Sequence, residues 1–337
     1  MKTTLSELCN GYSKNIALKD LINNNGTYPI YGASGYIKNV DFYVSDCDYL
    51  GIVKDGAGVG RVDKYPAYSS LLGTMQYIVP NADVDIDYLK YLLISLHLEN
   101  GVSGAAIPHI YYKNYKNLRV NVCEKTNQIQ IARQLDAICN SISLSKSILA
   151  LLDELVKSRF IEMFGNPQIN DKSFKTTKFI NVVTLQRGYD LPVNKRDNSG
   201  DIPVYGSNGL LGFHNQAKID QGIITGRSGT LGEVYMCDTP FWPLNTTLFS
   251  IDTHGNNLIY LQYLLIFYDL RRFASGAGVP TLNRNEFHDN EMISVPIELQ
   301  NEFAEFVKLI DKSKFIVQQQ IKDLQELLDS KMDEYFR

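Results

Sequence analysis

The stretch Leu155-Val156-Lys157-Ser158-Arg159-Phe160 recurs near the end of the chain as Leu327-Leu328-Asp329-Ser330-Lys331-Met332. Each copy closes a long segment that contains neither glycine nor proline between its ends, the two residues that disfavour a helix most. A duplication across so much of the chain predicts two copies of one structural unit. The chain is therefore expected to have two related halves, each running from a globular segment into a long helix.

Within both long segments, apolar residues alternate at spacings of four and three, which places them on one stripe of a helix. The segments are 125–165 and 297–337, and the helix in each covers about 38 residues, or about 57 Å. The stripe of the first helix consists of Ile131, Leu135, Ile138, Ile142, Ser145, Leu149, Leu152 and Val156, and that of the second consists of Phe303, Val307, Ile310, Lys314, Val317, Ile321, Leu324 and Leu328. Since a lone helix would leave this stripe in water, we expect the two helices to pack together as a coiled coil.

The globular segments, 1–124 and 166–296, are predicted to mix strands and helices. Short runs rich in β-branched and aromatic residues predict strands, and each half then has one helix. The expected strands are 49–53, 75–79, 223–225 and 247–251, and the expected helices are about 86–98 and 258–273. The predicted fold class is thus α+β, with two pseudo-symmetric globular domains separated by two long paired helices.

Three turn-rich loops are repeated between the halves: a Tyr-Gly loop, a glycine turn with nearby cations, and a Ser-Gly-x-x-x-Pro loop. The first loop reads Ile30-Tyr31-Gly32 in one copy and Val204-Tyr205-Gly206 in the other, and the third spans 103–108 and 275–280. The glycines match while their neighbours differ, as expected of one scaffold that recognises two different sequences.

The neighbours are residue types that contact the phosphates or the base edges of DNA. The candidate DNA-binding residues are Ser34, Tyr36, Lys54, Arg61, Lys64, Tyr111, Lys113, Ser207, Asn208, Arg227, Arg271, Arg272, Asn283 and Arg284. The alternative interpretation is that the glycines serve turn geometry alone and that the cations are only solvated.

Composition and charge are those of a soluble globular protein, with 44% hydrophobic and 21% charged residues and a net charge of −4. The acidity is concentrated in 297–337, which has six Lys or Arg against nine Asp or Glu, so the near-neutral globular segments can still present a basic face. No signal peptide and no apolar run of about 20 residues is found. Five scattered cysteines without a Cys-x-x-Cys pair fit a reducing, cytoplasmic setting and favour neither a zinc site nor a disulfide framework.

No catalytic constellation is evident in the sequence. The Gly-x-x-x-x-Gly-Lys-Ser/Thr phosphate loop is missing, and Gly56-Ala57-Gly58-Val59-Gly60 is interpreted as a tight turn between strands. His109 lies in a repeated loop, but its counterpart is Thr281, so we expect a loop or DNA-contact role instead of catalysis. Neither a cofactor nor a metal is expected on this chain.

The order of the duplicated motifs resembles that of the specificity (S) subunits of type I restriction-modification systems, over nearly the whole chain. In each half the two loops precede a Gln-x-x-Ile/Phe-Ala helix start and a Leu-x-x-Ser-Arg/Lys-x-x-Glu-x-Phe helix end. The helix starts contain Gln128, Ile131, Ala132, Gln300, Phe303 and Ala304, and the helix ends run from Leu155 to Phe164 and from Leu327 to Phe336.

This resemblance implies target-recognition domains at 1–124 and 166–296, each reading one part of a split double-stranded DNA target in the major groove. It implies long helices at 125–165 and 297–337, packed antiparallel as a ruler for the gap. The implied partners are two methyltransferase subunits that modify adenine. Restriction-translocase subunits are allowed as further partners. S-adenosylmethionine and ATP are expected on those partners only, and no membrane association is implied.

Two other interpretations stay open at this stage. The chain is equally compatible with a recognition subunit of a methylation-only, type II-like or phage-defence system that recruits no motor. From another class, it is compatible with a coiled-coil scaffold that carries two protein- or sugar-binding domains, although the lack of a signal peptide and the divergent loop cations disfavour this. An enzyme acting alone is the least favoured of these interpretations.

Overall fold

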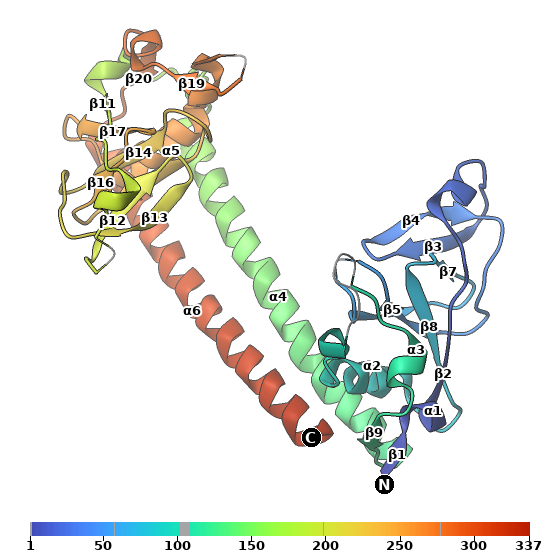
Figure 1. Ribbon diagram of the computed structural model, residues 1–337. Helices are drawn as coiled ribbons and strands as arrows, with labels where there is room; N and C mark the ends of the chain where they lie inside the picture. The colour runs from blue at the N-terminus through green and yellow to red at the C-terminus, as the bar shows by residue number, and fades with distance from the viewer. Residues whose placement is uncertain (1, 57, 102–107, 198, 277) are drawn as a thin grey trace. The chain divides into compact units, whose positions relative to one another are not determined.

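The computed structural model describes residues 2–56, 58–101, 108–197, 199–276 and 278–337. The chain divides into two compact units: unit 1 is Met1–Lys146 with Gln319–Arg337, and unit 2 is Ser147–Gln318. Figure 1 shows strands and helices in both units, together with two long helices. The predictions of a repeated chain and of a mixed α and β fold are confirmed. Most of the predicted Ser-Gly loop of the first half, 103–107, and Ala277 of the second lie outside the described residues.

A four-stranded antiparallel sheet in the order β2-β8-β5-β6 is the largest sheet of unit 1. A three-stranded sheet, β4-β3-β7, and a β1-β9 pair accompany it, and β3 runs parallel to β7. The strands are β1 (Lys2–Thr4), β2 (Cys9–Tyr12), β3 (Tyr28–Gly32), β4 (Gly35–Val40), β5 (Tyr49–Val53), β6 (Val62–Tyr65), β7 (Ser70–Leu71), β8 (Met75–Pro80) and β9 (Arg119–Asn121). The helices of this globular part are α1 (Leu5–Leu8), η1 (Leu18–Leu21), α2 (Ile86–Ser95), η2 (Leu98–Gly101) and α3 (Tyr112–Tyr115).

Unit 2 repeats these three sheets. Its sheets are β11-β17-β14-β15, β13-β12-β16 and β10-β20, together with a β18-β19 pair. The strands are β10 (Thr176–Lys178), β11 (Thr184–Arg187), β12 (Ile202–Gly206), β13 (Gly209–His214), β14 (Gly222–Gly226), β15 (Val234–Cys237), β16 (Trp242–Pro243), β17 (Thr247–Asp252), β18 (Ala274–Ser275), β19 (Thr281–Leu282) and β20 (Glu291–Ile293). The helices are α5 (Leu258–Tyr268), η3 (Phe179–Asn181), η4 (Val193–Lys195), η5 (Leu270–Phe273) and η6 (Arg284–Glu286). The equivalent strands β5 and β14 are buried throughout, as expected of central strands covered on both faces.

A buried glutamine joins each long helix to the globular part at its start. Gln128 accepts a hydrogen bond from the backbone N–H of Asp85 and donates one to the carbonyl of Cys123, both at 2.9 Å. Gln300 does the same with Asn257 and Val295, again at 2.9 Å. Asp85 and Asn257 are themselves the N-caps of α2 and α5. Both halves thus use the glutamine of the helix-start motif in the same way, because its amide satisfies buried backbone groups.

The two long helices, α4 (Lys125–Phe164) and α6 (Ile297–Phe336), are each 40 residues long. Gly165, with a positive φ of 68°, ends α4 and donates its N–H to the carbonyl of Ile161. Both helices lie partly in each unit. The helices therefore run slightly longer than the sequence predicted.

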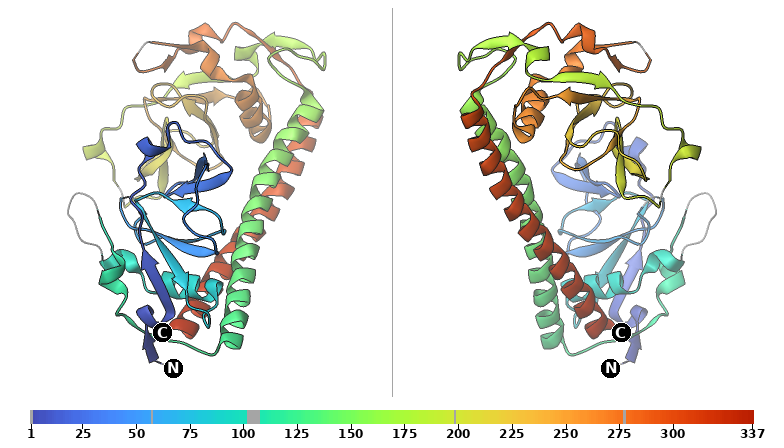
Figure 2. Two further views of the ribbon diagram at one scale, coloured as in Figure 1. Left: turned by 90° about the vertical axis from the view of Figure 1, so that its right-hand side faces the viewer. Right: turned by 90° about the vertical axis from the view of Figure 1, so that its left-hand side faces the viewer.

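Within each unit, part of α4 lies antiparallel to part of α6 (Figure 2). In unit 2, Arg159 contacts Glu302 at 2.9 Å, whereas Asp153, earlier on α4, contacts Lys314, later on α6, at 2.6 Å. In unit 1, the hydroxyl of Tyr335 donates to Gln134. Opposite directions along the two helices follow from this order of contacts.

All residues of the two predicted stripes are buried or half-buried in the structure. The polar member Ser145 is buried, and the side chain of Lys314 is only 18% exposed. Burial opposes the charge on Lys314, but its hydrogen bond to Asp153 and the charge of that carboxylate outweigh this effect and raise its pKa. A lysine is tolerated in the stripe because Asp153 of the facing helix pairs with it.

The prediction of one helix over 258–273 is wrong for the second part of this range. The helix α5 ends at Tyr268, because Asp269 adopts a left-handed backbone conformation with φ 52°. The Asp269 side chain then accepts from the N–H of Arg271 and caps the short helix η5. In unit 1, α2 ends at Ser95, before the predicted 98, and His97 has the same left-handed conformation with φ 47°.

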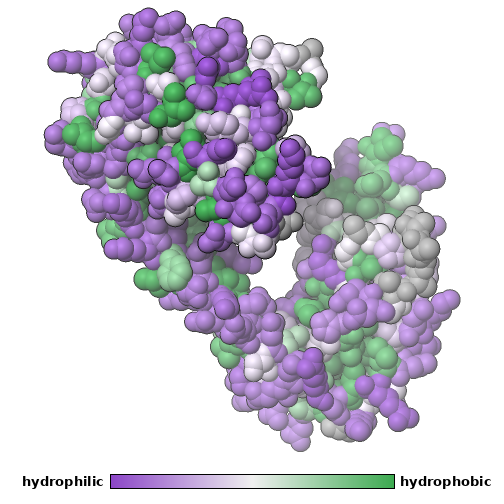
Figure 3. Space-filling model, turned by 60° about the vertical axis from the view of Figure 1, so that its left-hand side comes forward, coloured by the Kyte–Doolittle hydropathy of each residue, from purple (hydrophilic) through white to green (hydrophobic). Residues whose placement is uncertain are grey.

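Helix α4 has the length and composition of a membrane-spanning segment, with a window of 18 residues whose mean hydropathy is 1.4. The sequence had suggested no such segment. Helices inside water-soluble proteins meet the same two criteria, and α4 places its stripe against α6 in both units. Hydrophilic residues also dominate the face drawn in Figure 3, where apolar residues occur in small groups.

The aromatic packing around α4 and α6 differs between the units. In unit 2, Phe160 is fully buried and stacks on Phe267 with ring centres 4.8 Å apart. The equivalent positions in unit 1 hold Met332 and Ser95, and a pocket of about 520 Å³ lies beside them. The smaller side chains of Met332 and Ser95 thus leave a space in unit 1 that the rings of Phe160 and Phe267 fill in unit 2.

Candidate nucleic-acid interface

The β3–β4 turn and the start of β6 border a hollow of about 450 Å³ on unit 1. Four of the predicted residues, Ser34, Tyr36, Arg61 and Lys64, line it together. Ser34 and Tyr36 are exposed at the turn. The guanidinium group of Arg61 donates to the carbonyl of Ala33, which joins the Tyr-Gly loop to the glycine turn. The Tyr-Gly loop and the glycine turn of the first half therefore meet at one surface.

Acidic residues offset part of the positive charge in this hollow. Arg61 pairs with Asp63 at 3.1 Å, and Lys64 pairs with Asp87 of α2 at 2.9 Å. Burial raises the pKa of Tyr65, which also lines the hollow, to about 12, so its hydroxyl is neutral and can donate a hydrogen bond. The site is thus polar and hydrogen-bonding, with only a modest net charge.

The other three predicted residues of unit 1 form a second cluster. The ammonium groups of Lys54 and Lys113 lie 5.9 Å and 5.6 Å from the ring centre of Tyr111. Asp55, which was not among the predicted site residues, and His109, for which a loop or DNA-contact role was expected, lie beside them and are joined by a hydrogen bond of 2.6 Å. The glycine turn separates this cluster from Arg61 in the sequence.

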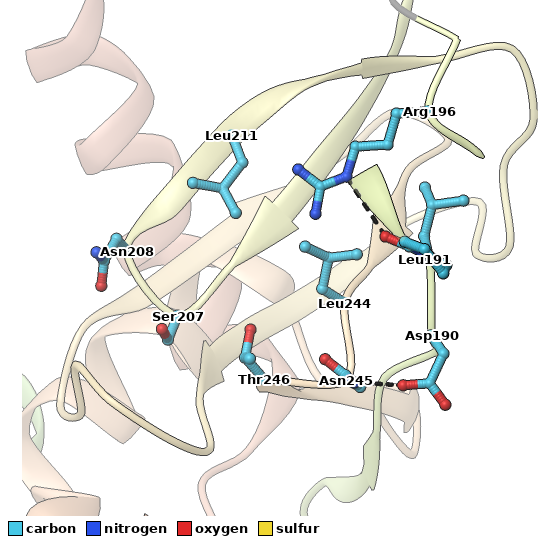
Figure 4. A pocket seen from close by; sticks show the side chains of 10 residues that line it. Asp190, Leu191, Arg196, Ser207, Asn208, Leu211, Leu244, Asn245 and Thr246 are labelled. Carbon is cyan, nitrogen blue, oxygen red and sulfur yellow. Dashed lines mark hydrogen bonds between the residues drawn. The ribbon is translucent and has the colours of Figure 1, made fainter. Parts of the chain in front are cut away.

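Unit 2 has a hollow of about 460 Å³ at its own Tyr-Gly loop (Figure 4). Ser207 and Asn208 line it as predicted, and Thr246 and Asn245 lie beside them. In Figure 4 the guanidinium group of Arg196 extends over Leu244, while its Nε donates to the carbonyl of Leu191 at 3.4 Å. The two hollows share the Tyr-Gly loop but continue along different segments, β6 in unit 1 and residues 190–196 with 244–246 in unit 2.

Arg227 borders the second hollow, because it donates to the carbonyl of Asn245 at 3.3 Å. Its backbone N–H donates to Thr246, just as that of Lys54 donates to Thr74 in unit 1. Arg227 is therefore the structural equivalent of Lys54.

The remaining predicted residues of unit 2 lie away from that hollow and make local contacts. Arg271 pairs with Asp269 at 2.7 Å, and its hydrogen bond lowers the pKa of that carboxyl group. Arg272 lies over the rings of Tyr268 and Phe273. Asn283 caps η6 through the N–H of Asn285, and Arg284 donates to the carbonyl of Leu185 at 3.4 Å. A DNA-contact role for these four residues stays a prediction, and the structure gives each of them a role in local folding.

Sequence reasoning missed Asp55, Arg196, Asn245 and Thr246. Asp55 and His109 form a hydrogen bond although they lie 54 positions apart in the sequence, and no local pattern predicts such a pair. Thr246 had a detectable signal, because its counterpart Thr74 occupies the same place in the first copy of the repeat, directly before a predicted strand.

Comparison with known proteins places the chain in a family. The family described as the type I restriction modification DNA specificity domain matches residues 1–154 and again residues 171–326. The chain belongs to this family of DNA specificity domains. No curated protein matched the sequence.

Two solved structures show the same fold over almost the full length of both chains. The crystal structure of the type I restriction-modification S subunit from M. genitalium aligns with a TM-score of 0.65 and 16% identity, over 100% of this chain and 96% of that one. A chain from a structural study of complex assembly and conformational transition of the type I R-M system aligns with a TM-score of 0.63 and 10% identity, over 99% and 97%. This chain is thus a type I restriction-modification specificity subunit, a recognition subunit without catalysis of its own, and neither the motor-free nor the scaffold alternative is favoured.

Proposed function

We propose that each unit reads one half of a split double-stranded DNA target and that partner methyltransferases modify adenines within it. The observation that supports this most is that each unit has a polar hollow at its Tyr-Gly loop and that the two linings differ. The first hollow is lined by Ser34, Tyr36 and Arg61, and the second by Ser207, Asn208 and Arg196. Hydroxyl, amide and guanidinium groups are those that discriminate base edges in the major groove. Two such surfaces on one scaffold suit two unrelated half-sites.

The methyltransferases would dock on the long helices. In unit 2, α4 exposes apolar side chains at helical spacing, among them Leu151 at 67% exposure and Leu155. On α6, Leu309, Phe315 and Ile316 are likewise exposed and line a shallow groove. Exposed apolar stripes of this kind mark protein interfaces. We propose two methyltransferase subunits, which carry S-adenosylmethionine, and restriction-translocase subunits, which use ATP, as partners in the cytoplasm.

Deleting the gene should remove one methylated motif from the host genome. We expect adenines in a single split motif to lose methylation, because the methyltransferases would lack their specificity subunit. Sequencing methylated bases with and without the gene measures this, and re-expression of the chain is the control. An unchanged set of motifs after deletion would rule out the proposed function.

Shortening both long helices should change the gap between the half-sites. Removing seven residues from the middle of each helix, 141–147 and 313–319, takes away about 10 Å, or about three base pairs. We expect methylation of a target with a shorter gap, or its loss where the two domains fall out of phase on the DNA. A matched variant replaces the same positions without changing the length. If the shortened protein methylated the original target at the original rate, the proposal that the long helices set the gap would be contradicted.

A further inference from the structure

The glycine turn that follows β5 is fastened to the segment before α3 in a way that unit 2 repeats. Gly56 donates its N–H to the carbonyl of Pro108, and Ile110 donates to Lys54, at 3.2 Å and 2.9 Å. The corresponding bonds in unit 2 join Gly229 to Pro280 and Leu282 to Arg227, at 3.3 Å and 2.7 Å. These bonds pair Asp55 with His109 in unit 1 and Ser228 with Thr281 in unit 2. The same backbone therefore presents two different side-chain pairs.

In unit 1 this position holds a linked acid and imidazole. Nδ1 of His109 lies 2.6 Å from Oδ1 of Asp55, and the two side chains are 35% and 25% exposed. Among the residues that the structure describes, Oδ2 of Asp55 has a long contact, 3.9 Å, with the ammonium group of Lys54 and no hydrogen bond. Within the described residues, Nε2 of His109 has no hydrogen-bond partner. One oxygen and one ring nitrogen thus remain available at a partly exposed site.

Cations and an aromatic ring surround the pair. The His109 ring lies nearly parallel to that of Tyr111, with centres 6.3 Å apart, and Lys54 and Lys113 both approach that ring. Lysines beside a hydrogen-bonding pair are suited to hold phosphates while the pair faces a base. In unit 2, Ser228 and Thr281 take the places of Asp55 and His109 and carry hydroxyl groups. The hydroxyl of Thr281 donates to the carbonyl of Val279 at 3.3 Å.

We propose that Asp55 and His109 form a base-reading pair that selects an exocyclic amino group, N4 of cytosine or N6 of adenine, in one half of the target. This inference rests on the proposed function of the chain. His109 holds the carboxylate of Asp55 through Oδ1, which leaves Oδ2 to accept the one amino hydrogen that a base pair leaves free in the major groove. Amino groups on cytosine and adenine satisfy acceptors in the major groove, whereas O6 and N7 of guanine and O4 of thymine do not.

The test uses the chain co-expressed with its cognate methyltransferase, and it reads out methylated motifs by sequencing. Asp55→Asn keeps the shape of the side chain but replaces one acceptor oxygen by a donor. The double variant Asp55→Ser, His109→Thr installs the pair of unit 2. The matched control, Ser228→Ala with Thr281→Val, alters the equivalent position of unit 2. Thermal unfolding of each variant checks that the fold is intact.

We expect both Asp55 variants to relax one position, a cytosine or adenine, in one half-site. Methylation of the original motif should fall roughly 5- to 150-fold, as for the loss of one good base contact. The control should leave that half-site unchanged. Folded Asp55→Asn protein with an unchanged motif and a rate within about twofold of wild type would overturn the proposal, as would a change confined to the other half. If the wild-type chain directed no methylation, the proposed function itself would fail, a result distinct from either.

Discussion

Exchanging residues 1–124 for the same segment of another specificity subunit will change one half of the methylated target and leave the other half intact. The two units have separate hydrophobic cores, one around Leu50 and Ile78 and the other around Leu185 and Leu248. Gln128 holds the exchanged segment through the backbone groups of Asp85 and Cys123, which a related domain also supplies. We expect the original motif to disappear and a hybrid motif to replace it, which sequencing of methylated bases will detect.

The reciprocal exchange of residues 166–296 is the matched control for this experiment. It should change the opposite half of the motif and no other position. If either exchange alters both halves, the units do not read DNA independently, and the two-reader proposal is wrong.

Phe160→Ala should destabilise the protein by about 3–5 kcal/mol, the usual cost of removing a buried ring from a core. Phe160 is fully buried, and its ring centre lies within 5.5 Å of those of Phe164, Phe267 and Phe303. The urea dependence of unfolding, followed by circular dichroism, measures the loss of free energy of unfolding. The transition of unit 2 should move to a lower urea concentration.

Met332→Ala tests the same position of the repeat in unit 1. Met332 is half-buried beside an existing pocket, so we expect a loss of only about 1 kcal/mol. Equal losses for the two variants would contradict the difference in packing between the units.

Local sequence patterns were sufficient for the elements that depend on periodicity. The run Tyr49–Val53 coincides with β5, and the two stripes are buried or half-buried along helices of 40 residues. Both features arise from the spacing of neighbouring residues, which sequence displays directly. The break at Asp269 was missed, because its left-handed backbone is stabilised by a side-chain hydrogen bond instead of by a glycine.

The candidate site was only partly predictable, for a related reason. Ser34, Tyr36, Arg61 and Lys64 could be chosen by residue type near repeated glycines, and the structure brings them together. Arg271 and Arg272 were chosen on the same grounds but make local contacts with Asp269 and Tyr268. Whether a cation faces the hollow or its own helix depends on tertiary contacts that residue type does not reveal.

Unit 1 takes its last segment, Gln319–Arg337, from the far end of the chain, and Phe336 packs there on Tyr88 with ring centres 5.3 Å apart. Unit 2, in contrast, is one continuous segment. Domains fold as their residues leave the ribosome. Unit 1, although its first residues are translated first, must therefore be the last unit to complete its fold. A chain truncated before Gln319 would therefore contain a complete unit 2 and an incomplete unit 1. Folding of unit 1 thus depends on the last turns of α6.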